Sequence, residues 1–176
     1  MSSHLTPEQA RLRAESLFHA GYNCAQSAIG PFCEQLGVDF NTVMRLSQPF
    51  GGGMSRMREV CGAVSGILMA AGLAAGSADP ADRDAKDNTY KLVQELAERF
   101  RLKHGSIICR ELLGLVPMGQ SQKAAETGQV ITHITQQPES SERTDEYYKK
   151  RPCQSLVGDA AETIQVWLDE RNGAET

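Results

Sequence analysis

Five cysteines are the residues of this chain best suited to chemistry, and four of them lie where the sequence signals the start of a helix. The five are Cys24, Cys33, Cys61, Cys109 and Cys153. A helix N-terminus offers unpaired N–H groups and a partial positive charge, which favour the thiolate that binds metals and does redox chemistry. The chain has no Cys-x-x-Cys pair, so any shared site must be assembled by the fold.

An all-helical domain can bring thiols from separate helices together at one end of a bundle. The four thiols expected to share a site are Cys24, Cys61, Cys109 and Cys153. Four soft anionic ligands suit an iron–sulfur cluster, mononuclear iron or zinc, and the ligand set alone does not choose among them. Basic residues near three of these cysteines would offset the repulsion between thiolates. They are Arg56, Arg58, Arg110, Lys149, Lys150 and Arg151.

Other roles for the thiols stay open at this point. Free cysteine is often a small buried filler, and Cys33, between Phe32 and Leu36 in a helical pattern, fits that role best. A pair of the cysteines could cycle between dithiol and disulfide without a metal. The thiols could also merely pack within a helical interaction module that exposes an apolar patch.

Two further features are weaker candidates for a functional site than the cysteines. The run Phe50–Gly53 precedes a helix but lacks the lysine and the Ser/Thr of a nucleotide-binding loop, so we expect it to let the chain pass close to the cysteines. The four histidines show no i, i+4 pairing, and His133 is the best placed of them. We predict no histidine ligand.

The elements that must position the cysteines are helices. The length of 176 residues and the apolar periodicity predict a single all-α domain, 1–176, of about six or seven helices. Its core is expected at about 6–115 and 152–172, and the polar segment 116–150 is expected to run over the surface, with a brief extended stretch at Val130 and Ile131.

Capping residues predict where these helices begin. Thr6, Asn23 and Asp39 should cap early helices, Asp79-Pro80 should open the longest one, and Ser106 should cap a short one carrying Cys109. The last helix should have Pro152 at its first position with Cys153 beside it. The glycine pairs of the apolar segment Val60–Gly76, four residues apart, predict close helix packing.

Charge and hydropathy exclude several classes of protein. A formal net charge of −4 offers no basic footprint for nucleic acid. The segment Val60–Gly76 is shorter than the roughly 20 apolar residues of a membrane span. The N-terminal residues lack a secretory pattern, so we expect a cytoplasmic protein with reduced thiols. Ala/Gly-rich faces would allow a homodimer, and the sequence does not identify a redox partner.

Several short sequence motifs resemble those of the C_GCAxxG_C_C family, a group named for its cysteine pattern. They are Tyr22-Asn23-Cys24-Ala25-Gln26, Phe50-Gly51-Gly52-Gly53-Met54, Cys61-Gly62-Ala63-Val64-Ser65-Gly66 and Cys109-Arg110-Glu111-Leu112-Leu113-Gly114, followed by the last cysteine before a helix. The resemblance spans about Tyr22 to Val166. It implies an all-helical domain and a redox role, with Cys24, Cys61, Cys109 and Cys153 as the signature cysteines.

The resemblance leads to a functional hypothesis. We expect the clustered cysteines to bind a metal or iron–sulfur centre for electron transfer, with a metal-free thiol redox protein as the alternative. An oxidisable cluster could be lost when the protein is purified in air. Two departures from the family pattern, Gly30-Pro31 and the additional Cys33, put the geometry of the site in question more than the identity of its ligands.

Overall fold

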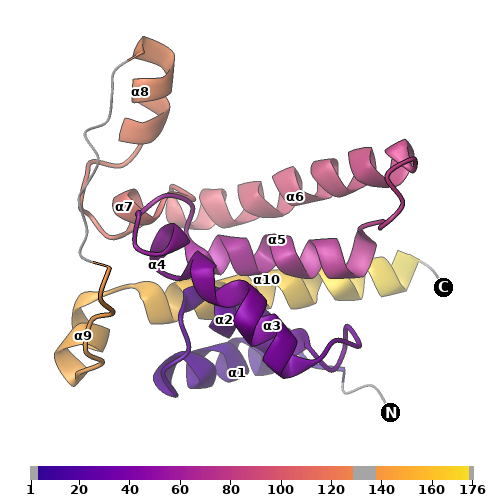
Figure 1. Ribbon diagram of the computed structural model, residues 1–176, viewed down its shortest axis with the longest axis horizontal. Coiled ribbons are helices and arrows are strands. Elements are labelled where there is room, and N and C mark those ends of the chain that lie inside the picture. Colours follow the sequence, from indigo (N-terminus) through magenta and orange to yellow (C-terminus); the bar gives the residue numbers. More distant parts are fainter. Residues whose placement is uncertain (1–3, 129–137, 175–176) are drawn as a thin grey trace.

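The computed structural model describes residues 4–128 and 138–174, and this part of the chain folds into helices (Figure 1). The α-helices are α1 Pro7–His19, α2 Cys24–Ile29, α3 Phe40–Ser47, α4 Gly51–Met54, α5 Gly62–Ala75, α6 Arg83–His104, α7 Cys109–Leu112, α8 Gln120–Thr127, α9 Asp145–Lys150 and α10 Cys153–Ala174. Short 3-10 turns, Gly30–Phe32 and Gln48–Phe50, follow α2 and α3. Extended pairing in the described residues is confined to one isolated bridge, between Val60 and Ile108. The all-α prediction is confirmed.

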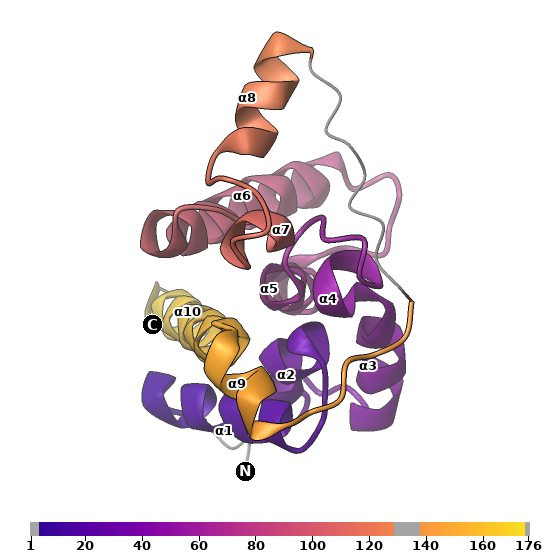
Figure 2. The ribbon, with the colours of Figure 1, turned by 90° about the vertical axis from the view of Figure 1, so that its left-hand side faces the viewer.

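The helices outnumber the prediction because short turns and the polar segment 116–150 also fold. The helices α8 and α9 lie in that segment, and α8 projects away from the bundle in both views (Figures 1 and 2). The extended stretch predicted at Val130 and Ile131, and also His133, lie outside the described residues.

The core forms where α10 packs against α1, α2, α5 and α6. Its largest fully buried side chains include Phe18, Phe32, Phe100, Ile67 and Ile164. Gly66 of α5 faces α2 so closely that a β-carbon there would lie 2.5 Å from Cβ of Ala28. The predicted close helix packing is therefore confirmed at Gly66. It is not found at Gly72, where a β-carbon would meet open space.

The predicted caps of the first helices are confirmed. Thr6 and Asn23 form capping boxes with Gln9 and Gln26, and the Asp39 side chain accepts a hydrogen bond from the Thr42 N–H group. Each polar cap satisfies backbone donors that the first turn leaves unpaired.

Two predicted helix starts are wrong by a few residues. Helix α6 begins after Asp82 rather than at Asp79-Pro80. The Asp79 side chain instead accepts a hydrogen bond from the Ala81 N–H group and closes a separate turn. Ser106 likewise accepts from Ile108 N–H in a turn, and α7 begins only at Cys109. Helix α10 begins at Cys153, one residue after Pro152.

The apolar segment predicted to be a buried helix forms α5, which has 14 residues. Across the described ranges, no helix is both long and apolar enough to cross a membrane.

Candidate functional site

The four signature cysteines occupy the starts of four helices. Cys61 is the N-cap of α5, and Cys24, Cys109 and Cys153 are the first residues of α2, α7 and α10. All four line one cavity of about 670 Å³. It lies at the end of the bundle where α4, α7 and α9 are found, the end that faces the viewer in Figure 2. The fold thus brings together the thiols that sequence reasoning grouped, and their role as ligands stays a prediction.

A short antiparallel bridge fixes Cys61 beside Cys109. The Cys61 N–H donates to the carbonyl oxygen of Ile107 at 2.8 Å, and the Cys109 N–H donates to that of Glu59 at 2.7 Å. These hydrogen bonds hold the N-termini of α5 and α7 next to each other. Both cysteines are buried, with 4% and 6% of their surfaces exposed.

Gly62, directly after Cys61, sets the distance between α5 and α2. A β-carbon on Gly62 would lie 2.9 Å from Cβ of Cys24 and 3.0 Å from the carbonyl oxygen of Phe50. Any larger residue would push the two helix starts apart. The glycines of the Cys-Gly-Ala-x-x-Gly motif therefore let α5, which begins after Cys61, lie against α2, which begins at Cys24.

The glycine run passes close to the cysteines, as the sequence predicts. A β-carbon on Gly51 would lie 2.3 Å from Cγ of Asn23, and one on Gly53 would lie 2.6 Å from Cβ of Cys109. Gly53 also has a φ of +69°, which strongly favours glycine. Bulkier residues at either position would displace the loop from the site.

The chain remains left-handed beyond the glycines. Met54, Ser55, Arg56 and Arg58 have φ values of 58°, 51°, 67° and 61°. Left-handed backbone costs a non-glycine residue roughly 1–2 kcal/mol. Such strain clusters at functional sites. Here the strained loop carries Arg56 and Arg58 to the lining of the cavity.

Cys24 and Cys153 line the same cavity, and each shifts the pKa of the other. The thiol of Cys153 donates a hydrogen bond to the sulfur of Cys24, and this bond is the main cause that lowers the pKa of Cys24 to about 7. Burial opposes the shift, while the Gly52 N–H and the charge of Arg143 assist it. The same hydrogen bond raises the pKa of Cys153, since that thiol must keep its proton to donate it. The pKa values of the two thiols are therefore shifted in opposite directions.

The other two thiols in the cavity are held neutral. Burial raises the pKa of Cys61, although N–H groups of Ala63 and Val64 point at its sulfur. Burial also raises the pKa of Cys109, against the opposing effect of Arg58, whose guanidinium lies 3.9 Å from the Cys109 sulfur. Of the four thiols that line the cavity, Cys24 is the one whose pKa is lowered.

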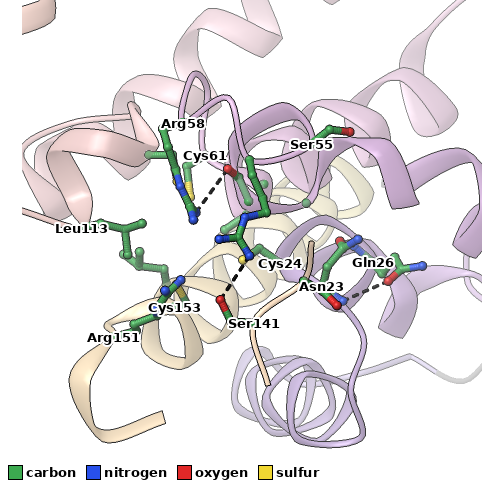
Figure 3. Close-up of a pocket in the computed structure, with 18 of the residues that line it drawn as sticks. Asn23, Cys24, Gln26, Ser55, Arg58, Cys61, Leu113, Ser141, Arg151 and Cys153 are labelled. Carbon is green, nitrogen blue, oxygen red and sulfur yellow. Dashed lines mark hydrogen bonds between the residues drawn. The ribbon is translucent and has the colours of Figure 1, made fainter. Parts of the chain in front are cut away.

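The charges around the thiols differ in part from those predicted. Arg56, Arg58 and Arg151 line the cavity, as does Arg143, which sequence reasoning missed (Figure 3 labels Arg58 and Arg151). Of the other predicted basic residues, Arg110 pairs with Glu59, Lys150 pairs with Glu146, and Lys149 is exposed. Arg143 lies in a polar segment without periodicity, so no sequence signal marked it.

Cys33 is buried away from the cavity, at 5% exposure. Burial raises the pKa of its thiol, which makes it a poor nucleophile. This placement agrees with the filler role predicted for Cys33.

The thiols that line the cavity are also potential metal ligands. Four thiols and neighbouring cationic groups are the right chemistry for a soft metal. Within the described residues, however, no three ligating side chains are close enough to hold one ion. The four cysteines line one cavity, and metal binding by them stays a prediction.

The cysteine pattern is shared with a known protein family. The model of the family described as "Putative redox-active protein (C_GCAxxG_C_C)" matches residues 22–166. This chain belongs to the C_GCAxxG_C_C family. Membership in the C_GCAxxG_C_C family agrees with a redox role for the thiols that line the cavity. No curated protein and no solved structure matches the chain.

Proposed function

We propose that this C_GCAxxG_C_C protein is a thiol–disulfide redox protein in which Cys24 and Cys153 are the working pair. The observation that carries the proposal is the placement of both thiols in one cavity, at the starts of α2 and α10, where Cys153 lowers the pKa of Cys24. A low-pKa thiolate beside a protonated partner thiol is the arrangement that disulfide exchange requires. No Cys-x-x-Cys motif is needed, because the starts of α2 and α10 supply the pair.

The reaction proceeds in two exchanges. The Cys24 thiolate attacks one sulfur of a substrate disulfide, whose S–S bond breaks and releases one thiolate, which takes up a proton. Cys153 then loses its proton and attacks the Cys24 sulfur of the mixed disulfide, which releases the second substrate thiol. The protein dithiol is oxidised to a disulfide, and one substrate disulfide is reduced to two thiols. An external dithiol reverses the change in the protein.

The surrounding groups assist the first step. The Gly52 N–H and the positive charge of Arg143 stabilise negative charge on Cys24. Cys61 and Cys109 stay protonated under neutral conditions, because burial and the neighbouring thiolate disfavour a second charge. One thiolate is therefore present in the cavity at a time.

A trapping experiment tests the assignment. Cys153→Ser removes the resolving thiol, so reduced protein treated with 2-hydroxyethyl disulfide should accumulate a mixed disulfide on Cys24, found by peptide mass spectrometry. Cys33→Ser is the matched control and should form no lasting adduct. Trapping on Cys61 or Cys109 instead, with Cys24 unmodified, would contradict the assignment.

A second candidate is an iron–sulfur cluster, iron or zinc held by Cys24, Cys61, Cys109 and Cys153. It is favoured by one observation, the lining of one cavity by four soft donors and no carboxylate among the described residues. When bound, such a cluster would supply one-electron transfer. Anaerobic purification, metal analysis and a visible spectrum test it. Metal that is retained by wild type and lost in both Cys24→Ser and Cys61→Ser would support it, and unchanged metal content in the variants would oppose it.

A further inference from the structure

The cavity around the thiols carries positive charge. Four arginines line it, Arg56, Arg58, Arg143 and Arg151, and its described lining includes no Asp or Glu. Its other polar groups are neutral amides and hydroxyls. Figure 3 shows Arg58 and Arg151 around the same space as Cys24, Cys61 and Cys153. Apart from the thiols, the described lining is thus built of cationic and neutral groups.

Among the described residues, the hydrogen bonds of the Arg56 guanidinium go to neutral acceptors, while the negative charge of Glu139 acts on it electrostatically. The guanidinium donates to the carbonyl oxygen of Glu139 and to Oγ of Ser141, the latter at 3.1 Å. In the described part of the chain, its Nε is buried without a hydrogen-bond partner. Burial and the repulsion of Arg58 and Arg151 lower its pKa. An anion that entered the cavity would relieve this repulsion.

Two further guanidiniums are held by stacking rather than by carboxylates. Arg151 lies 4.7 Å from the ring centre of Tyr147. Arg143 lies 5.0 Å from the same ring and donates to the carbonyl oxygens of Phe18 and Tyr22. Aromatic faces and carbonyl groups fix the orientation of these cations without neutralising them.

We propose that the disulfide reduced by Cys24 and Cys153 is a small molecule that carries carboxylates. Arginine binds carboxylate with two parallel hydrogen bonds, which would seat the charged ends of such a molecule beside the thiolate. The cavity volume of about 670 Å³ is in the usual range for small-molecule sites. This inference rests on the proposed thiol–disulfide function and names its substrate class.

A charge series of symmetric disulfides tests the inference. The probes are 3,3′-dithiodipropionate (anionic), 2-hydroxyethyl disulfide (neutral) and cystamine (cationic). The rate of Cys24–Cys153 oxidation is followed by acid quench and mass spectrometry, and each rate is divided by the rate with free 2-mercaptoethanol, which corrects for the reactivity of the probe. We expect the normalised rate for dithiodipropionate to exceed that for cystamine by about tenfold or more at low salt.

Charge variants identify the residues responsible. Arg151→Gln should reduce the ratio of anionic to cationic rates about three- to tenfold, and Arg151→Lys should restore much of it. Lys149→Gln, which makes the same change in net charge at an exposed position outside the lining, should leave the ratio unchanged. Equal effects of Arg151→Gln and Lys149→Gln would overturn the assignment to the cavity.

The two proposals fail in different ways. If the neutral disulfide also leaves Cys24 and Cys153 reduced, the proposed function is wrong. If the neutral disulfide oxidises the pair while the anionic and cationic probes give equal normalised rates, the inferred substrate class is wrong and the function stands. In that case the arginines serve only to balance the thiolate.

Discussion

Gly53 approaches Cys109 so closely that a β-carbon on the glycine would lie 2.6 Å from Cβ and 3.1 Å from Sγ of the cysteine. The contact joins the left-handed loop to the start of α7. It places a loop that carries two arginines against a thiol of the cavity. The glycine run is therefore a structural requirement of the site.

Gly53→Ala should destabilise the fold by about 2–4 kcal/mol, because it adds left-handed strain and a clash with Cys109. Gly37→Ala is the control, since Gly37 has a similar φ of +65° but open space around its Cβ position. We expect that control to lose only about 1–2 kcal/mol. Urea denaturation measures the free energy of unfolding of both variants. Equal losses of stability would show that the close approach to Cys109 does not contribute to the effect of Gly53→Ala.

Asn23→Ala should affect both stability and the reactivity of Cys24. The Asn23 side chain caps α2 and donates to the carbonyl oxygen of Gln48 at 2.9 Å, so its loss should cost about 1–2 kcal/mol. It should also slow alkylation of Cys24, whose position depends on this helix start. Thr6→Ala removes a comparable cap from α1 and should lower stability without changing the alkylation rate. A Cys24 rate that is unchanged in Asn23→Ala would refute the link between cap and thiol.

The reactivity of Cys24 should depend on the donor at residue 153. The alkylation rate of wild type with iodoacetamide should rise with pH and reach half its maximum near pH 7, since the pKa of Cys24 is lowered to about 7 chiefly by Cys153. In Cys153→Ala the midpoint should move up towards the ordinary cysteine value of about 8.5. Cys153→Ser retains a donor and should keep the midpoint low. Identical midpoints in all three proteins would remove the hydrogen bond as the cause.

An ion-pair network around the buried Asp159 should make the fold sensitive to acid. Burial raises the pKa of Asp159, but hydrogen bonds and charges from Lys103 and Arg11 outweigh it and lower the pKa overall. A lowered pKa contributes stability that is present above the unfolded value of about 4 and is lost as pH falls through the folded value. Asp159→Asn should cost about 1–3 kcal/mol at pH 7. The difference in unfolding free energy from wild type should shrink below pH 4, and a constant difference would contradict this account.

Sequence reasoning predicted the parts of the site that depend on local signals. Asn23 and Asp39 cap helices because their short polar side chains satisfy backbone donors, which can be read from the sequence. The choice of Asp82 over Asp79 could not be predicted in this way, since either residue can cap and tertiary packing decides.

The chemistry inside the cavity depends on tertiary geometry. The grouping of four cysteines followed from their places at helix starts and from the resemblance to a family. The shared placement of Cys24 and Cys153 and the entry of Arg143 into the lining depend on how α2, α10 and the segment before α9 pack. Periodicity does not encode that packing. The thiol pair and the missed arginine therefore emerged only from the structure.

The most direct test of the account is a map of the disulfide formed in the wild-type protein. Fully reduced protein is oxidised with one equivalent of 2-hydroxyethyl disulfide, quenched in acid, digested and analysed by mass spectrometry without reduction. We predict a linkage between Cys24 and Cys153, with Cys33, Cys61 and Cys109 still free. A linkage between any other two cysteines, with Cys24 and Cys153 both unmodified, would contradict the central claim.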